Sequence, residues 1–200
     1  MMTQTLYLMR HGQTLFNAQH RIQGWCDSPL TEKGIAQAKI AADYFPDNGI
    51  TLDAAYCSTA ERASDTLELV TQLPYTRVKG LREWNFGAFE AQPEYLNPPL
   101  PYNDFFVRYG GESQDQVQDR LSKTITTIMA HDPSQHVLMV SHGGAIANFY
   151  RAWQQYEAIP FTGHFGNCCI LTFTFDGQHF VLQAVFNPDF SELDAPYAQK

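Results

Sequence analysis

The chain has 200 residues, a formal net charge of −8 at pH 7 and a hydrophobic content of 44%. This much apolar material supports a packed core, so the composition excludes wholesale disorder. The length fits a single domain over residues 1–200. The acidic balance, with no run of Lys or Arg, argues against nucleic-acid binding and against an anionic membrane surface as a partner.

Cysteine usage and the N-terminal segment indicate the compartment. Cys26, Cys57, Cys168 and Cys169 lack the CxxC spacing of a zinc or redox site, so we expect reduced thiols. Cys168 and Cys169 fall in a strand-like run, where neighbouring side chains point to opposite faces. Residues 1–9 do not resemble a signal peptide, and no apolar run approaches the roughly 20 residues of a membrane helix. We therefore expect a cytoplasmic protein with no membrane partner.

Strand-like and helix-like segments alternate along the chain. Apolar runs predict strands at Leu6–Met9, Ala54–Cys57, Arg77–Leu81 and His136–Ser141. Thr31 is predicted to cap a helix whose inward face holds Ile35, Ala38, Ala42 and Phe45. Capping boxes predict two more helices. The first box is Ser58 with Glu61, and the inward face of its helix holds Ala63, Thr66, Leu67, Val70 and Leu73. The second box is Ser113 with Gln116, and the inward face of its helix holds Val117, Leu121, Ile125 and Ile128. A fourth helix is predicted from about Ala145.

Near the end, Asp176 and Gly177 are predicted to join Leu171–Phe175 to Phe180–Phe186 in a hairpin. Strands separated by helical segments predict crossovers and helices on both faces of a sheet. The expected fold is therefore a three-layer α/β/α sandwich whose mostly parallel sheet has an antiparallel edge. That edge can pair two subunits or be covered within one, so both monomer and homodimer remain open.

One segment departs from the alternation. Residues 84–109 contain eight aromatic side chains and four prolines, which preclude a long uninterrupted helix. We expect a variable insertion at about residues 84–112 that serves as a lid over a site or as a cap on the core.

Two histidines share the same local context. His11 and His142 each follow a predicted strand and each precede a glycine, Gly12 and Gly143. In an open parallel sheet, ligands bind at the carboxyl ends of the strands, so both imidazoles are predicted to face one crevice. The glycines allow an anion to approach the backbone N–H groups closely.

Charged residues near these histidines suggest phosphoryl transfer. A neutral imidazole can attack phosphorus and form a phosphohistidine, while Arg10, Arg62 and the second histidine offset charge on the phosphoryl oxygens. Glu83 can supply the proton that an alkoxide leaving group needs. Taken alone, Arg62 also fits a surface salt bridge with Glu61 or Asp65, and Glu83 also fits a solvated carboxylate.

The ordered motifs resemble those of the histidine phosphatase superfamily, the phosphoglycerate mutase-like proteins. The resemblance spans positions 8 to 144 and consists of Leu8-Met9-Arg10-His11-Gly12-Gln13-Thr14 with Asn17, the run Gln23 to Gly34, Ser58 to Thr66, Leu81-Arg82-Glu83 with Phe86-Gly87 and Glu90, Gly111-Glu112-Ser113, and Val140-Ser141-His142-Gly143-Gly144.

The resemblance implies a role for each matching residue. His11 would accept the phosphoryl group, which Arg10, Arg62 and His142 would hold, and Glu83 would act first as proton donor and then as the base that activates water. Further substrate-binding positions would be Asn17, Gln23, Gly24, Thr14 and the Gly143 amide. The aromatic segment would correspond to the family's variable insertion, which shapes substrate choice.

The superfamily contains hydrolases and isomerases. A mutase must retain a phosphorylated acid, which calls for extra cations, yet Arg108 is the one basic residue between Glu83 and Glu112. The run from Gln23 to Gly34 also looks more like that of small broad-specificity phosphatases. We therefore expect a phosphomonoesterase acting on a small phosphorylated metabolite, with a 2,3-bisphosphoglycerate-dependent phosphoglycerate mutase as the alternative.

Two other classes fit less well. A non-catalytic phospholigand-binding module would have been suggested by loss of His11 or Glu83, and both are present. A metallohydrolase is disfavoured because no HExxH motif or paired Asp/His ligand spacing occurs, and arginines beside the histidines would repel a divalent cation. We therefore expect no metal and no other cofactor.

Overall fold

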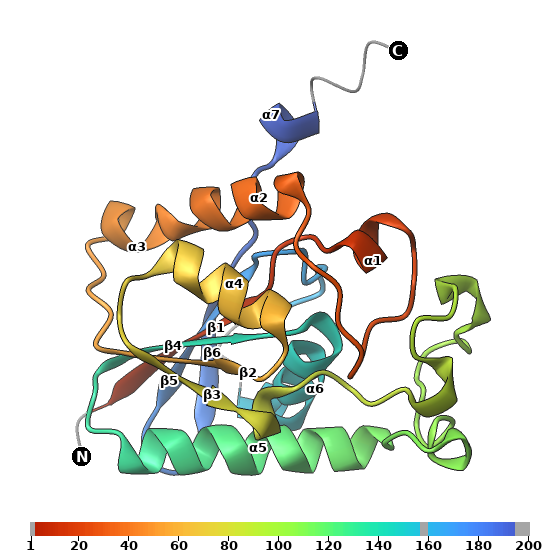
Figure 1. Ribbon diagram of the computed structural model, residues 1–200. Helices are drawn as coiled ribbons and strands as arrows, with labels where there is room; N and C mark the ends of the chain where they lie inside the picture. The colour runs from red at the N-terminus through yellow and green to blue at the C-terminus, as the bar shows by residue number, and fades with distance from the viewer. Residues whose placement is uncertain (1–2, 157–159, 195–200) are drawn as a thin grey trace.

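The apolar runs form a six-stranded sheet in the computed structural model, which describes residues 3–156 and 160–194 (Figure 1). The strands are β1 (Gln4–Arg10), β2 (Ala54–Ser58), β3 (Tyr75–Val78), β4 (His136–Ser141), β5 (Ile170–Phe175) and β6 (Phe180–Phe186), in the spatial order β3-β2-β4-β1-β5-β6. The first four run parallel, and β5 and β6 are antiparallel to their neighbours. The predicted mixed sheet with its hairpin edge is confirmed.

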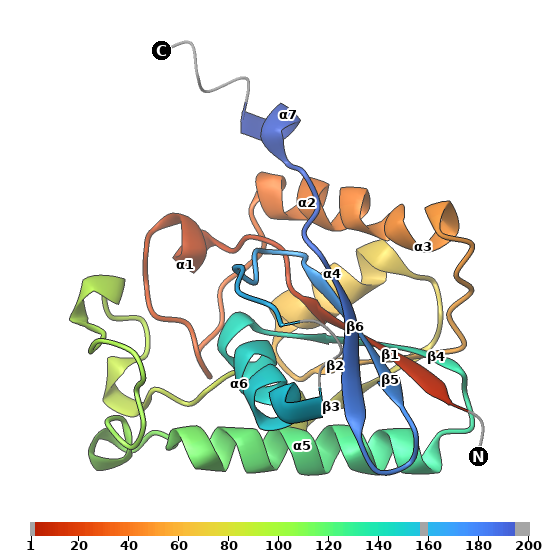
Figure 2. The same ribbon diagram turned by 180° about the vertical axis from the view of Figure 1, so that it is seen from behind.

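Helices cover both faces of this sheet (Figures 1 and 2). The α-helices are α1 (Leu15–Ala18), α2 (Glu32–Ala42), α3 (Tyr44–Asp47), α4 (Glu61–Val70), α5 (Gln114–His131), α6 (Gly143–Trp153) and α7 (Ser191–Asp194). Short 3₁₀ helices are η1 (Lys79–Leu81), η2 (Gly87–Phe89), η3 (Glu94–Leu96), η4 (Val107–Tyr109) and η5 (Gln154–Tyr156). None of the helices in the described part of the chain has the length and apolar character that a membrane crossing demands.

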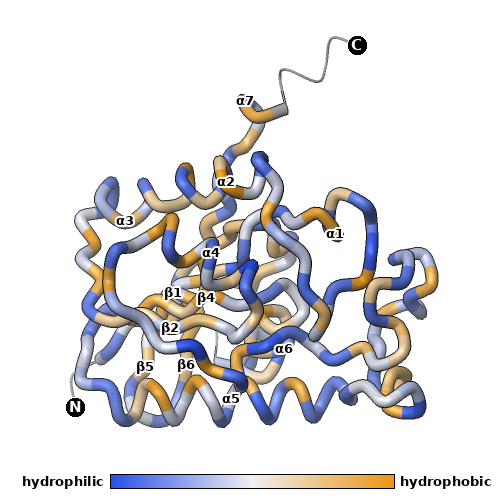
Figure 3. The backbone as a smooth tube through the Cα atoms, in the orientation of Figure 1, coloured by the Kyte–Doolittle hydropathy of each residue, from blue (hydrophilic) through white to orange (hydrophobic). Residues whose placement is uncertain are grey.

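The two layers of core arise from the alternation of side chains along each strand. On β1, Leu6 and Leu8 pack with residues of α5 and α6, whereas Tyr7 and Met9 pack with residues of α2 and α4. The strands are accordingly the apolar centre of the chain trace, between more polar helices and loops (Figure 3). Cys168 and Cys169 precede β5 and do not belong to the strand predicted for them, since Cys168 lies in a turn with a positive φ; their side chains nevertheless pack into different layers.

Several local predictions are wrong. Ser58 and Glu61 form no capping box: Ala60 is the N-cap residue of α4, and the Ser58 hydroxyl accepts a hydrogen bond from the Ala60 N–H. The strand predicted over Arg77–Leu81 is strand only to Val78. The inward face predicted for α2 is also wrong at Ile35, which is 37% exposed. On α5, Ile128 packs partly buried against the core as predicted, and Met129 is buried as well.

The segment 84–112 is irregular and lies beside α1 and the N-terminal end of α5 (Figures 1 and 2). Its aromatic rings pack edge to face around Phe106, which is fully buried. Backbone hydrogen bonds join it to the loop after α1, from Ile22 N–H to Gln92 O at 2.7 Å and from Ala91 N–H to Ile22 O at 2.9 Å. The segment is therefore held both by the main core and by the loop after α1, which continues into the predicted pocket residues Gln23 and Gly24.

Candidate active site

The pairing of β1 with β4 brings the two predicted histidines together. Arg10 lies opposite Ser141 in the parallel register, so His11 and His142 leave the sheet side by side. The His11 N–H donates to the Ser141 carbonyl at 3.1 Å, and the ring centroids of the two histidines are 5.2 Å apart. Both side chains are buried at the carboxyl ends of their strands.

The contacts of His11 define its tautomer. Nδ1 lies 2.7 Å from the Gly12 carbonyl oxygen, which can only accept, so Nδ1 carries the proton. The Arg62 Nε–H points at Nε2 at 3.3 Å, which agrees with a lone pair on Nε2. Burial, Arg62 and Arg10 together hold the pKa of His11 well below 6.5. His11 therefore presents a neutral, nucleophilic Nε2.

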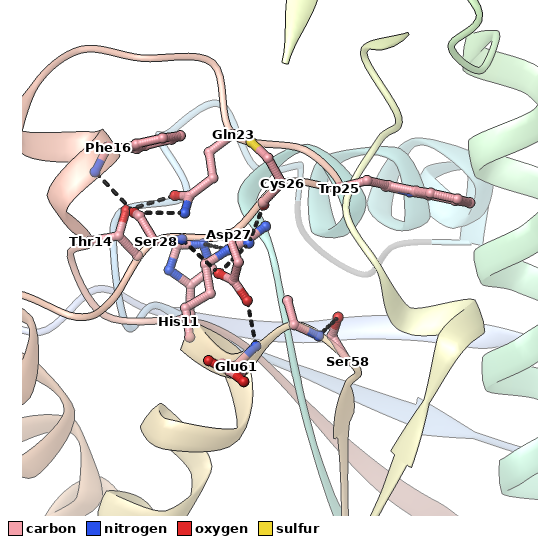
Figure 4. Close-up of polar contacts among 12 residues, drawn as sticks. His11, Thr14, Phe16, Gln23, Trp25, Cys26, Asp27, Ser28, Ser58 and Glu61 are labelled. Atoms are coloured by element: carbon pink, nitrogen blue, oxygen red, sulfur yellow. Dashed lines mark hydrogen bonds and ion pairs between the residues drawn. The ribbon is translucent and has the colours of Figure 1, made fainter. Parts of the chain in front are cut away.

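Arg62 is a fully buried cation held by the loop of residues 24–27. Its Nη2 donates to the Gly24 carbonyl at 2.9 Å, and its Nη1 donates to the Cys26 carbonyl at 3.0 Å and to Asp27 Oδ1 at 2.8 Å. Asp27 also accepts from the Glu61 N–H at the start of α4 (Figure 4). The surface salt bridge considered above is thus replaced by an ion pair between the fully buried Arg62 and the partly exposed carboxylate of Asp27.

Arg10 and His142 carry polar atoms that the described protein leaves unpaired. The Nη1 of Arg10 donates to the Phe165 carbonyl at 2.8 Å, but its Nε is buried with no partner in the described residues. Both ring nitrogens of His142 are also buried without a hydrogen-bond partner there. Burial is the main cause that holds the pKa of His142 well below 6.5. Unpaired buried donors and acceptors of this kind mark this end of the cavity as a candidate binding site for a polar group.

Glu83 is buried on the other side of the cavity floor. Its Oε1 accepts from the Trp84 N–H and its Oε2 from the Gly144 N–H, both at 2.8 Å. Burial raises the pKa of Glu83, although these N–H groups and the two arginines partly oppose the shift. A Cβ at position 144 would lie 2.8 Å from Oε1, so glycine is needed there. A carboxyl group with a raised pKa suits a proton donor.

The remaining predicted residues divide into two groups. Asn17, Gln23 and Gly143 line the cavity. The Thr14 hydroxyl instead donates to Gln23 Oε1 at 2.6 Å, and it orients that amide (Figure 4). Gly24 acts through its carbonyl on Arg62 and leaves no room for a side chain, because a Cβ would lie 2.2 Å from the Trp84 carbonyl oxygen.

A cavity of about 720 Å³ opens above His11 and Glu83. Arg10, His11, Glu83 and Gly143 form part of its wall, whereas Arg62 and His142 lie behind that wall. The other lining residues used below are Arg21, Glu94, Asn97, Leu100, Tyr102, Gly144, Ala147, Asn148, Arg151 and His164.

Sequence reasoning missed several of these residues. Asp27 and Glu90 lie inside the quoted motifs, but nothing in the sequence shows that they anchor the loop; Glu90 accepts from the N–H groups of Gly24, Trp25 and Cys26 at 2.8–3.0 Å. Arg21 and Arg151 carry no motif at all. Among the described residues, no group of three or more His, Cys, Asp or Glu side chains is placed to hold a metal ion.

Comparison with known proteins places this geometry in a family. The model of the histidine phosphatase superfamily (branch 1) matches residues 6–188, and the chain belongs to that superfamily. The chain is 32% identical over 160 residues to the metal-independent phosphoserine phosphatase of Arabidopsis thaliana, covering 72% of this chain and 66%, just under two thirds, of that protein. It is 33% identical over 153 residues to the "Probable phosphoglycerate mutase" of Yersinia pestis, covering 70% of each.

Solved structures agree with this assignment. The crystal structure of phosphoglycerate mutase from Bacillus anthracis matches with a TM-score of 0.78 and 26% identity, covering 91% of this chain and 92% of that chain. The predicted α/β fold of the phosphoglycerate mutase-like proteins is confirmed. Phosphatase and mutase both occur as names among these relatives, so family membership by itself leaves two reactions.

The two site histidines are expected to remain uncharged in mildly acidic solution. Between about pH 7.5 and pH 5.5, the ring ¹⁵N signals of His11 and His142 should not titrate, because burial and the two arginines keep both pKa values well below 6.5. The His11→Ala and His142→Ala variants assign the signals. The same signals in urea-unfolded protein provide the reference, and titration of either ring near its unfolded pKa in the native protein would contradict the geometry.

Proposed function

We propose that the protein is a metal-independent phosphomonoesterase that hydrolyses a small phosphorylated metabolite through a phosphohistidine. The observation that carries the proposal is the neutral Nε2 of His11, which contacts the buried Arg62, feels the charge of the half-buried Arg10, and shares a cavity with the buried carboxyl group of Glu83. This combination supplies a nucleophile, positive charge and a proton donor in one place.

The phosphoryl group would lie against Nε2 with its oxygens near the unpaired buried atoms. Arg10 Nε and the His142 ring nitrogens are donors or acceptors that await a partner. Arg62 adds a fixed positive charge behind Nε2. The Asn17 amide and the Gly143 N–H at the start of α6 are further donors on the cavity wall. Positioned donors of this kind stabilise the charge that spreads over the phosphoryl oxygens.

Proton transfer then completes two half-reactions. In the first, the P–N bond to His11 forms, the P–O ester bond breaks, and the leaving oxygen takes the proton of Glu83. In the second, Glu83 takes a proton from water, the hydroxide attacks phosphorus, and the P–N bond breaks to release inorganic phosphate. A raised pKa on Glu83 favours the first step, and the N–H groups of Trp84 and Gly144 stabilise the carboxylate in the second.

Water is proposed as the acceptor because the cavity wall is open. Leu100, which lines the cavity, is 67% exposed, so water has access to a phosphohistidine there. One observation favours the mutase as the second candidate, because Arg21 and Arg151 both line the cavity and supply the extra cations that a mutase needs. Arg108, the cation counted in the sequence, instead stacks on Phe105 and Tyr109 outside the cavity.

A phosphoenzyme should be trapped on His11. Wild-type protein mixed with ³²P-labelled substrate and quenched in alkali should retain label that acid removes, which is the stability expected of phosphohistidine. His11→Ala should retain none, and His142→Ala should retain less label at the same position. Exhaustive chelation is the control for metal independence and should leave the labelling unchanged. Label retained in His11→Ala would exclude His11 as the acceptor.

The loss of turnover caused by replacing Glu83 should increase with the basicity of the leaving group. Glu83→Gln should reduce turnover of alkyl phosphates by about 10²–10⁴-fold, but should affect phosphorylation by p-nitrophenyl phosphate much less, because p-nitrophenolate leaves without a proton. The wild-type rate of phosphorylation by an alkyl phosphate should fall as pH rises through the raised pKa of Glu83, and this fall should be absent in the variant. Glu32→Gln on the exposed face of α2 is the matched control. Equal losses on both substrates would contradict the assignment.

Product analysis separates the two reactions. With 3-phosphoglycerate, the proposed hydrolase releases inorganic phosphate at a rate that does not depend on 2,3-bisphosphoglycerate. Faster formation of 2-phosphoglycerate, dependent on the bisphosphate, would identify a mutase instead. The measurement is a ³¹P NMR time course with and without the bisphosphate.

A further inference from the structure

Helix α6 connects the phosphoryl end of the cavity to a second cation. Gly144, Ala147, Asn148 and Arg151 all line the cavity, and their spacing of three, four and seven residues places them on one face of the helix. The N-terminal turn of this face touches Glu83 through Gly144. The same face therefore ends at Arg151, away from His11 along the helix.

Arg151 differs from the other cavity arginines in its contacts. Arg10 donates to the Phe165 carbonyl and Arg21 donates to the Ala91 carbonyl. In the described part of the chain, Arg151 has no hydrogen bond, ion pair or ring contact, and its side chain is exposed. An unpaired guanidinium on the wall of a cavity presents N–H donors in a fixed geometry that a carboxylate can accept as a pair.

The distance suits a small leaving group. Seven residues of helix separate Gly144 and Arg151 by about 10 Å along the axis. Helical side chains lean towards the N-terminus, so the Arg151 guanidinium projects back over the turn of Ala147 and Asn148. A phosphoryl group bound at the Gly143 end would therefore leave room for a leaving group of about two or three carbons before the guanidinium.

A second lining residue offers an acceptor. Asn97 Oδ1 is buried and has no hydrogen-bond partner among the described residues, although the residue lines the cavity. Tyr102 and Glu94 also line the cavity, and the charges of Glu94 and Arg151 both act on the Tyr102 hydroxyl, whose pKa is raised mainly by burial. A ligand in this part of the cavity would thus meet both a cation and an unused acceptor.

We propose that Arg151 is a specificity-determining residue that binds the carboxylate of the leaving group, so that the cavity takes phosphomonoesters of small hydroxy or amino acids. The hydroxyl or ammonium group beside that carboxylate donates to the Asn97 amide oxygen. This inference rests on the proposed function for the site, because it assumes that the phosphoryl group is bound at His11.

Two matched pairs of substrates isolate the carboxylate. 3-Phosphoglycerate and glycerol 3-phosphate differ by a carboxylate in place of a hydroxymethyl group, and O-phosphoserine and O-phosphoethanolamine differ by the presence of a carboxylate. For each pair, the ratio of the two kcat/KM values measures selectivity for the acid. In the wild type we expect a ratio of about 10 or more in both pairs, the effect of one charge-assisted hydrogen bond.

Variants at position 151 should change this ratio. Arg151→Gln should lower it by about 10- to 50-fold in both pairs, and Arg151→Lys should give an intermediate value because a lysine keeps the charge and loses the paired N–H geometry. Arg108→Gln is the matched control, since it removes an exposed arginine outside the cavity and should keep the ratio within about twofold. A wild-type ratio near one, or equal changes in Arg151→Gln and Arg108→Gln, would overturn the proposal.

A binding experiment keeps this result separate from the proposed reaction. Calorimetry with His11→Ala measures the affinities of 3-phosphoglycerate and glycerol 3-phosphate without turnover. Tighter binding of the acid that disappears in His11→Ala/Arg151→Gln supports the subsite even if the wild type proves to be a mutase or a binding protein. Equal affinities in His11→Ala would contradict the subsite even if the wild type hydrolyses both esters.

Discussion

The structure depends on a guanidinium with no exposed surface, that of Arg62. A buried charge is destabilising unless its donors are paired, and here two carbonyl oxygens and the Asp27 carboxylate pair them. Those partners lie in a loop without regular structure, so the loop must itself be held. Glu90 does this by accepting from three successive backbone N–H groups of residues 24–26. Because Glu90 belongs to the segment 84–112, the wall of the cavity and the charge beside His11 are parts of one connected structure.

The shifted pKa values of His11, His142 and Glu83 lower the free energy of unfolding over parts of the pH range. The pKa of each site histidine lies well below its ordinary value of 6.5, so the unfolded chain binds protons first, and stability falls as pH drops below about 6.5. The pKa of Glu83 is raised above 4.5, so the protonated carboxyl is the form the fold favours, and stability is lost as pH rises through that raised pKa. The two histidines therefore destabilise the fold below about pH 6.5, and Glu83 destabilises it as the pH rises above 4.5. Such opposed shifts are characteristic of acid–base sites.

The sequence alone predicts the parts that depend on local pattern. Short apolar runs locate five of the six strands closely, and β3 approximately, because a strand buried between two helical layers is apolar on both of its faces. The two histidines are predicted as neighbours because strand ends of a parallel sheet meet at one edge. Contacts set by tertiary packing escape this reasoning. The capping box predicted at Ser58 is absent because the Ser58 hydroxyl accepts a hydrogen bond from the Ala60 N–H instead. Arg151 reads in the sequence as an ordinary surface arginine, and only the position of α6 beside the cavity shows otherwise. Counting cations within residues 84–112 failed for the same reason, since the cations of the cavity come from elsewhere.

The two ends of the cavity differ in how their charges are held, and this difference separates chemistry from selectivity. At the phosphoryl end, Arg62 is fixed by carbonyl oxygens and a carboxylate, and Glu83 by two backbone N–H groups. A change to any of these partners leaves a buried charge unpaired, so substitutions there damage every reaction the site performs. At the far end, Arg151 is exposed and, within residues 3–156 and 160–194, unpaired by the protein. Its replacement leaves no buried group without a partner. The Arg151 end of the cavity can therefore change its ligand without leaving the buried groups around His11 unpaired, which is the physical basis for varying selectivity while the proposed phosphoryl site stays the same.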